Sequence, residues 1–254
     1  MKTALCQYDI RWEDKEASKK KILEMAQACA GMQDIDWLIF SEMTLSGFTM
    51  NAAIASLLPE DLRFFGELAR KHSVNVSFGG VQEGFNKLIT MDRSGKIINA
   101  YSKMHLYAFG GEDRHYSPGT RQETFEMEGL RVTPAVCFDL RFPYLFWNAA
   151  EKTDIYLVIA AWPARRAEHW TTLLRARAVE NQCYCIGVNR TGAEGKVEYS
   201  GNSMIYDPLG KVALDCGTAD GIFISETDVT KELVEKTRTR FPFLKERKPG
   251  AAFV

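Results

Sequence analysis

The order of elements that hydrophobic patterning predicts for the first half of the chain recurs in the second half. Each half is predicted to form strand, helix, strand, helix, strand and hairpin. In the first half these elements are expected at residues 3–8, 14–30, 37–40, 59–72, 74–78 and 87–101. In the second half they are expected at residues 132–137, 143–151, 155–161, 168–182, 184–188 and 204–214. Two such units can bury sheet against sheet with helices outside, which predicts an α/β fold.

The turns of the two predicted hairpins support this internal duplication, because their sequences are alike. Residues 92–96 are Asp-Arg-Ser-Gly-Lys, and residues 207–211 are Asp-Pro-Leu-Gly-Lys. Short turn motifs also recur by chance, so from sequence the duplication is a hypothesis. Residues 237–254 contain two prolines and no clear period. We therefore expect one domain over residues 1–254, with residues 237–254 as a C-terminal tail that packs across a surface or a second subunit.

The composition narrows the classes of partner. The chain has 254 residues, of which 46% are apolar, and this is enough for a sizeable core. Its formal net charge of -1 argues against a nucleic acid or a membrane surface as the main partner. Neither a run of eighteen apolar residues nor an apolar leader after Met1 is present, so a cytoplasmic protein is expected.

The six cysteines do not form a recognisable metal motif. They stand at positions 6, 29, 137, 183, 185 and 216, and none forms a C-x-x-C pair. Cys183 and Cys185 alternate near a predicted strand, but no histidine or further cysteine is near enough in sequence to complete a zinc site. A glycine-rich phosphate loop is also absent. We therefore expect reduced, buried thiols at every position except 137, and no metal or other cofactor.

Cys137 lies where a nucleophile would be placed. An apolar strand leads into it, residues 138–142 are predicted to turn the chain, and Pro143 can open a helix. A strand–turn–helix junction pushes a side chain out of the sheet and aims backbone N–H groups at developing negative charge. The alternative is an ordinary buried cysteine, which behaves as a small hydrophobic residue.

Two further residues with suitable chemistry also follow predicted strands. Glu42 comes after residues 37–40, and Lys103 after residues 97–101. If they converge with Cys137, Glu42 can accept the thiol proton and return it to a leaving nitrogen. Lys103 can favour the thiolate and, with the backbone N–H of Phe138, stabilise an oxyanion while a thioester forms. Taken singly, a strand-end Glu or Lys is usually a solvated surface charge.

Four segments together resemble the nitrilase superfamily of carbon–nitrogen hydrolases. They are FSEMTLSGF (40–48), YSKMHL (101–106), TPAVCFDLRFP (133–143) and the stretch 161–192, and the resemblance extends over about residues 3–226. It implies a four-layer α-β-β-α sandwich with two related halves and a catalytic Glu42–Lys103–Cys137 triad. It also implies a second glutamate after the lysine, for which Glu112 is the matching position and Asp113 the competitor.

Within this superfamily, Trp162 to Arg166 with His169-Trp170 resembles the bacterial ω-amidases. These hydrolyse the side-chain amide of 2-oxo acids such as 2-oxoglutaramate or 2-oxosuccinamate. An arginine fork would suit the substrate carboxylate; Arg166 is the first candidate, Arg141 the second, and Arg165 stays open. A structural ion pair with Asp139 or with a nearby helix is the alternative for Arg141. The resemblance also leaves room for another small amide or an N-carbamoyl compound. Trp162 and Phe138 are expected to line the substrate pocket.

Two other classes of function stay open at this point. A cysteine–histidine hydrolase would need His105 or His115 near the thiol, and a nitrilase-like domain could bind a ligand without catalysis. Members of the superfamily usually associate, so at least a homodimer is expected. The helices predicted at 143–151 and 168–182 would form the shared face, through Tyr144, Leu145, Phe146, Trp147, Trp170, Leu173 and Leu174.

Overall fold

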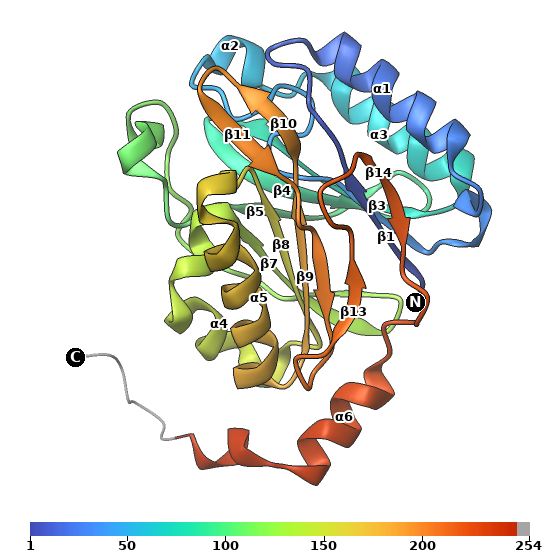
Figure 1. Ribbon diagram of the computed structural model, residues 1–254, viewed down its shortest axis with the longest axis vertical. Helices are drawn as coiled ribbons and strands as arrows, with labels where there is room; N and C mark the ends of the chain where they lie inside the picture. Colours follow the sequence, from blue (N-terminus) through green and yellow to red (C-terminus); the bar gives the residue numbers. More distant parts are fainter. Residues whose placement is uncertain (248–254) are drawn as a thin grey trace.

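Two six-stranded sheets with the same internal order form the centre of the molecule (Figure 1). The computed structural model describes residues 1–247. The first sheet has the order β14-β1-β2-β3-β4-β5, and the second has the order β13-β12-β9-β8-β7-β6. The strands of the first sheet are β1 (Thr3–Gln7), β2 (Trp37–Ile39), β3 (Asn75–Gln82), β4 (Phe85–Met91), β5 (Ile97–Ser102) and β14 (Gly221–Ile224). Those of the second are β6 (Phe125–Met127), β7 (Leu130–Val136), β8 (Ile155–Ala160), β9 (Tyr184–Asn189), β12 (Met204–Tyr206) and β13 (Val212–Asp215).

The strand directions confirm the predicted duplication. In each sheet three parallel strands, β1-β2-β3 or β7-β8-β9, continue into an antiparallel hairpin. An antiparallel edge strand, β14 or β6, completes each sheet on the other side. The two hairpin turns also share their geometry. The backbone N–H groups of Lys96 and Lys211 each donate to the aspartate that opens the turn, at 3.0 and 2.9 Å. Gly95 and Gly210 adopt positive φ angles of 79° and 74°.

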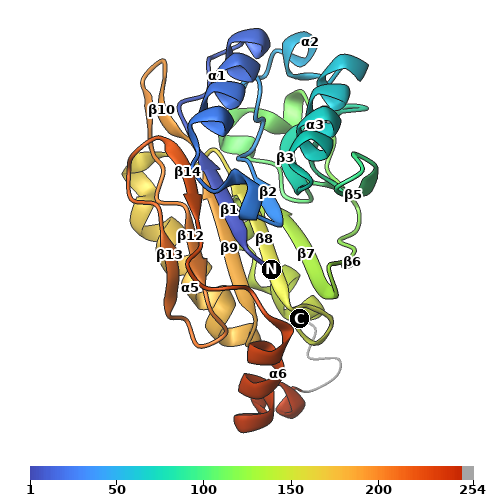
Figure 2. The same cartoon turned by 90° about the vertical axis from the view of Figure 1, so that its right-hand side faces the viewer.

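Four helices cover the outer faces of the sheets (Figures 1 and 2). They are α1 (Lys15–Ala28) and α3 (Pro59–His72) on the first sheet, and α4 (Pro143–Ala149) and α5 (Ala167–Asn181) on the second. Local chemistry sets their first residues. The Asp14 side chain accepts the Ala17 N–H at 2.9 Å, and Asp61 accepts the Leu58 N–H at 2.9 Å. Pro143 occupies the first position of α4, as expected.

Three apolar cores separate the four layers. Strand residues alternate between faces, so that Leu5 of β1 packs between the sheets while Ala4 and Cys6 face the helices. The core between the sheets joins residues such as Trp37 to Val136. The outer cores join Phe65, Leu68 and Ala69 to the first sheet, and Leu145, Phe146, Trp170 and Leu174 to the second. The fold is therefore the expected α-β-β-α sandwich.

The structure adds elements that the sequence pattern did not predict. A separate two-stranded sheet, β10 (Thr191–Glu194) and β11 (Val197–Ser200), follows β9, and a short helix α2 (Ala52–Ala55) follows β2. A further helix, α6 (Lys231–Arg240), runs through Thr237, where we placed the start of the tail. Residues 248–254 of that predicted tail lie outside the described residues. Within residues 1–247 no helix is long and apolar enough to cross a membrane.

The described end of the chain packs against the second half of the domain. The Gln182 side-chain amide donates to the Phe241 carbonyl at 2.7 Å. Arg238 of α6 donates to the carbonyls of Ala150 and Thr153 at 2.9 and 2.6 Å. These hydrogen bonds give partners to backbone carbonyl groups near the ends of helices, which would otherwise be unpaired.

Candidate active site

Glu42, Lys103 and Cys137 come together at one end of the sandwich. Glu42 follows β2 and Lys103 follows β5 in the first sheet, whereas Cys137 follows β7 in the second. Glu42 and Lys103 are fully buried, while Cys137 is half-buried and faces a cavity. The duplicated layout explains the meeting, because equivalent strand ends of the two sheets open on the same side.

Both oxygens of the Glu42 carboxylate have partners. Oε1 accepts from Lys103 Nζ at 2.8 Å, and Oε2 accepts from the Ala161 backbone N–H at 2.8 Å. Ala161 follows β8, the strand that corresponds to β2 in the second half. This hydrogen bond therefore connects the two equivalent loops of the duplicated fold and fixes the carboxylate at their junction.

Lys103 lies between two buried carboxylates. Its Nζ is 2.8 Å from Glu42 Oε1, and 3.0 and 2.8 Å from the two oxygens of Glu112. Glu112 also accepts the Tyr107 backbone N–H at 2.6 Å. Burial alone would disfavour the ammonium, but Glu42 and Glu112 outweigh it and raise the pKa of Lys103 above its ordinary value. The lysine is therefore a permanent cation at neutral pH. Asp113, the competitor, is exposed.

Asn86 is a further member of this group that the sequence did not reveal. Its side-chain amide donates to Glu42 Oε1 at 2.8 Å and to Glu112 Oε1 at 2.7 Å. Its own carbonyl oxygen is buried without a partner in the described part of the chain. One amide thus bridges two like charges that would otherwise repel. An asparagine at the start of β4 has no sequence signal for this role, because such residues are common in turns.

The backbone at Cys137 is held in an unusual conformation. Its φ angle is 47°, in the left-handed region that non-glycine residues rarely occupy. Asp139 supports the turn, because its carboxylate accepts the Val136 N–H at 3.0 Å and the Tyr101 hydroxyl at 2.8 Å. The strand–turn–helix placement expected from sequence is present, with a short 3-10 turn at Cys137–Arg141 before α4.

The pKa of the Cys137 thiol is not lowered, as it would be in a site that stabilises a thiolate. Burial and the negative charge of Glu42 raise the pKa of the Cys137 thiol well above its ordinary value, although Lys103 opposes them. Lys103 lowers the pKa of the thiol, as expected, but burial and Glu42 raise it by more. The raised pKa favours the protonated thiol, with Glu42 as its hydrogen-bond partner.

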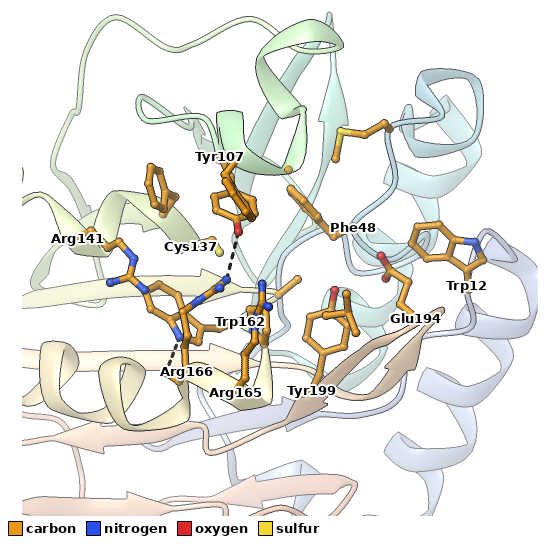
Figure 3. Close-up of a pocket in the computed structure, with 17 residues that line it drawn as sticks. Trp12, Phe48, Tyr107, Cys137, Arg141, Trp162, Arg165, Arg166, Glu194 and Tyr199 are labelled. Atoms are coloured by element: carbon orange, nitrogen blue, oxygen red, sulfur yellow. Dashed lines mark hydrogen bonds between the residues drawn. The ribbon is translucent and has the colours of Figure 1, made fainter.

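A cavity of about 980 Å³ opens directly above the thiol (Figure 3). Phe138 and Trp162 line it, as expected. It also contains three guanidinium groups, which we call the arginine cluster: Arg141, Arg165 and Arg166. Its other lining residues come mainly from four loops and the β10–β11 hairpin: Trp12, Phe48, Met50, Tyr107, Phe109, Gly110, Ala161, Pro163, Glu194, Val197 and Tyr199.

The arginine cluster has no carboxylate partner among residues 1–247. The Arg141 guanidinium lies over the Trp162 ring at 4.6 Å and contacts His169, and it does not pair with Asp139. Arg166 lies over the Tyr107 ring at 5.7 Å. Burial and the neighbouring Arg166 lower the pKa of Arg141. Uncompensated cations at the wall of a cavity favour an anionic ligand.

The part of the cavity wall that β10 and β11 form was not predicted. Glu194 of β10 and Tyr199 of β11 line it, and a fully buried arginine, Arg190, supports both. Arg190 Nη1 donates to Glu194 Oε2 at 2.6 Å, and its guanidinium lies 4.5 Å from the centre of the Tyr199 ring. Burial raises the pKa of Glu194 to about 7, against the opposing charge of Arg190.

The histidines are placed away from the cavity wall. His105 contacts Asp139 at 2.8 Å and stacks on Phe142. No histidine lines the cavity in the part of the chain that the structure describes, which argues against a cysteine–histidine hydrolase. Among residues 1–247, no group of three or more His, Cys, Asp or Glu side chains is arranged to hold a metal ion.

The strand order of the sandwich and the three side chains at its mouth match the arrangement that the sequence resemblance implied, that of hydrolases acting on carbon–nitrogen bonds other than peptide bonds. The chain belongs to the carbon–nitrogen hydrolase family, whose sequence model matches residues 2–239. This family is part of the nitrilase superfamily, so the resemblance seen in the sequence is confirmed.

Similar proteins include two groups of named amidases. Omega-amidase YafV of Yersinia enterocolitica is 33% identical over 254 residues, which cover 95% of this chain and 94% of that protein. The 2-oxoglutaramate amidase of Bacillus subtilis is 32% identical over 204 residues, covering 76% of this chain and 78% of that protein. A solved structure of a CN-hydrolase superfamily protein from Xanthomonas campestris, with an arsenic adduct in its active site, has a TM-score of 0.89. It is 28% identical and covers 98% of this chain and 97% of that one.

Proposed function

We propose that the enzyme hydrolyses the side-chain amide of short 2-oxo-dicarboxylic acid monoamides, such as 2-oxoglutaramate or 2-oxosuccinamate, to the 2-oxo acid and ammonia. The observation that carries this proposal is the arginine cluster without counter-ions, in the same cavity as Cys137. A substrate with a carboxylate remote from its amide would supply the missing charge. The omega-amidase and 2-oxoglutaramate amidase relatives support the same substrate class.

The first half of the reaction forms a thioester. As the Cys137 sulfur attacks the amide carbon, its proton passes to Glu42, which already accepts the thiol hydrogen bond. Lys103 Nζ and the Phe138 backbone N–H stabilise the oxyanion. Glu42 then returns the proton to the nitrogen, the C–N bond breaks, and ammonia leaves.

The second half hydrolyses the thioester. Glu42, again a carboxylate, takes a proton from water as its oxygen attacks the thioester carbon. The C–S bond breaks, the proton returns to sulfur, and the 2-oxo acid leaves. Glu112 and Asn86 do not exchange protons in this scheme. They hold Lys103 and Glu42 in place through the hydrogen bonds described above.

A substrate screen scored by ammonia release tests the proposal. The panel contains 2-oxoglutaramate, 2-oxosuccinamate, glutamine, asparagine, simple amides, N-carbamoyl amino acids and nitriles, with Cys137→Ala as the control for background. We expect the highest kcat/KM on a 2-oxo-acid amide, and only a trace of activity in the control. If the wild type does not hydrolyse either 2-oxo-acid amide but cleaves another amide, the proposed substrate class is wrong. The proposed amidase activity would then still stand.

A further inference from the structure

Tyr107 contacts two parts of the candidate active site with two different groups. Its side-chain hydroxyl accepts a hydrogen bond from Arg166 Nη2 at 3.4 Å, which Figure 3 draws as a dashed line. Its backbone N–H donates to Glu112 Oε2 at 2.6 Å. The function proposed above uses the arginine cluster for the charged end of the substrate and Glu112 for the placement of Lys103. It gives Tyr107 no role, although this one residue contacts both.

The members of the arginine cluster repel one another. Burial is the main cause of the lowered pKa of Arg141, and the positive charge of Arg166 is the next. The two guanidinium groups are therefore close enough to interact, and long cationic side chains usually turn their charged ends toward water. Arg141 and Arg166 nonetheless line the cavity, which indicates that other contacts hold them there.

Aromatic rings supply these contacts, one for each guanidinium group. Arg141 lies over the Trp162 ring at 4.6 Å, and Arg166 lies over the Tyr107 ring at 5.7 Å. The Trp162 indole N–H also donates to the Arg166 backbone carbonyl at 2.8 Å, which fixes the main chain there. The Tyr107 ring packs in turn against Phe138, whose ring centre is 5.3 Å away. The ring and the hydroxyl of Tyr107 therefore hold the Arg166 guanidinium from a fixed position.

The Tyr107 hydroxyl can serve a ligand as well as Arg166. A tyrosine hydroxyl that accepts one hydrogen bond can still donate its own proton, and a guanidinium has five N–H donors. Both Tyr107 and Arg166 line the cavity above Cys137. A carboxylate that pairs with Arg166 beside this hydroxyl would therefore receive hydrogen bonds from two residues, and hydrogen bonds to a charged acceptor are the stronger kind.

The backbone of Tyr107 connects the same residue to the catalytic lysine. Glu112 Oε2 accepts from the Tyr107 N–H at 2.6 Å and from Lys103 Nζ at 2.8 Å, and both Glu112 and Lys103 are fully buried. A variant that moved the Tyr107 main chain would disturb Lys103 as well. Tyr107→Phe keeps the main chain and the ring, so it removes the hydroxyl alone.

We propose that Tyr107 determines the preference for a charged substrate end, because it holds Arg166 at the cavity wall and donates its hydroxyl proton to the same carboxylate. This inference rests on the substrate class proposed above and adds a residue to its recognition. The hydroxyl takes no part in the proton transfers of thioester formation or hydrolysis. Its loss should therefore weaken binding of the charged end and leave the chemical steps in place.

Two amides of the same chain length test the proposal. 2-Oxoglutaramate carries the charged end, and pentanamide lacks it. In Tyr107→Phe, we expect kcat/KM for 2-oxoglutaramate to fall about tenfold, mainly through a higher KM, on the scale of a hydrogen bond to a charged group. The value for pentanamide should stay close to that of the wild type. Tyr184→Phe is the control, because its hydroxyl also accepts an N–H at 3.4 Å, from Thr230, but does not line the cavity. It should keep both values.

A double-variant cycle on 2-oxoglutaramate alone tests whether Tyr107 and Arg166 act on one carboxylate. Tyr107→Phe should cost much less in the Arg166→Ala background than in the wild type, because the shared contact is already lost. Losses that multiply in the double variant would overturn the inference, and so would equal losses on the two amides. An active wild type with unchanged KM in Tyr107→Phe would overturn the inference alone. A wild type that does not hydrolyse 2-oxoglutaramate would overturn the proposed substrate class with it.

Discussion

At the scale of single residues, Cys137 shows how the surroundings of a side chain set its chemistry. Cys137 has a strained φ of 47°, and its thiol has Glu42 as a hydrogen-bond partner, which is the contact that the proposed proton transfer requires. Its raised pKa follows from burial and from Glu42, two features that tertiary structure creates. The sequence predicted Cys137 and the turn that follows it. For the ionisation of the thiol, it predicted only that Lys103 would favour the thiolate.

The first prediction concerns the ionisation of this thiol. Because the pKa of Cys137 is raised, the reactive thiolate should be scarce at neutral pH and should increase as the pH rises. Alkylation of Cys137 by iodoacetamide, measured by mass spectrometry at a series of pH values, should therefore accelerate steadily from pH ~7 to pH ~9. A rate that is already constant across this range would show a lowered pKa and contradict the assignment.

The second prediction concerns the two buried partners of the cysteine. Glu42→Gln keeps the shape but removes the base, and Lys103→Met removes the charge. Each should lower kcat by at least ~10²-fold, the lower range for a lost general base or oxyanion donor. The double variant should lose less than the product of the two single losses, because the groups act as a unit. Turnover close to wild type in either single variant would show that its role is misassigned.

The third prediction concerns the carboxylate of the substrate. Arg166→Ala should lower kcat/KM for 2-oxoglutaramate by about 10²-fold, since truncating one member of a buried charge pair costs roughly 2–5 kcal/mol. The loss on a neutral amide of similar length should be much smaller. Arg166→Lys should restore only part of the activity, because an ammonium lacks the fork.

Two outcomes of the Arg166→Ala assay would revise this assignment. Equal losses on charged and neutral amides would show that Arg166 supports the fold. Unchanged kinetics on both would transfer the role to Arg141 or Arg165, which line the same cavity.

The residues alone predicted the three central side chains because these follow strands, and the family resemblance added Glu112. Glu42, Lys103 and Cys137 all follow strands, and the strands before Glu42 and Cys137 are strongly apolar. Asn86 and Glu194 were missed, because their roles depend on contacts with residues far along the chain or on burial by another loop. A hydrogen bond across 44 residues leaves no local signature in the sequence.

At the scale of elements, apolar periodicity determined which parts of the fold were predictable. Strands such as β8 and helices such as α3 have continuous or striped apolar residues, and the structure places them within a few residues of their predicted bounds. The β10–β11 hairpin lacks such a pattern, since residues 191–200 are mostly polar or glycine. Its position depends on tertiary contacts, including the bridge from Thr191 to Asp9 and the Arg190 network.

The fourth prediction concerns the contact between β3 and the loop that carries Glu42. A Cβ atom on Gly79 would lie 2.6 Å from the Met43 backbone nitrogen and 2.7 Å from the Glu42 Cα. Gly79→Ala should therefore displace Glu42, lower kcat strongly, and destabilise the fold by roughly 1–3 kcal/mol through overpacking. Thermal denaturation and turnover on the best amide measure the two effects.

A matched glycine in α3 serves as the control for this substitution. A Cβ on Gly66 would meet its nearest neighbours at 3.4 Å, which is ordinary contact, and alanine favours a helix. Gly66→Ala should therefore keep full activity and the wild-type stability or more. Normal activity in Gly79→Ala would show that the close approach to Glu42 does not position the carboxylate.

At the scale of the whole molecule, the outer face of α4 and α5 is the surface for which the sequence predicted association. Of the seven apolar residues considered for a shared face, Leu145, Phe146, Trp170 and Leu174 are buried in the protein's own core. Three others, Tyr144, Trp147 and Leu173, retain exposed area. The helices therefore contribute part of their apolar surface to the domain and leave part on its exterior, and only the second part can serve an interface.

The fifth prediction is that the protein forms at least a homodimer through this face. Burying apolar side chains of two copies against each other would remove them from water, and a two-fold contact pairs the same surface on both subunits. Light scattering at micromolar concentration should give a mass of at least two chains. Leu173→Glu, which places a charge on the α5 face, should shift the mass toward that of one chain. Leu23→Glu, on the exposed side of α1 across the sandwich, should not. A monomeric mass for the wild type, or equal masses for the two variants, would place any association elsewhere or exclude it.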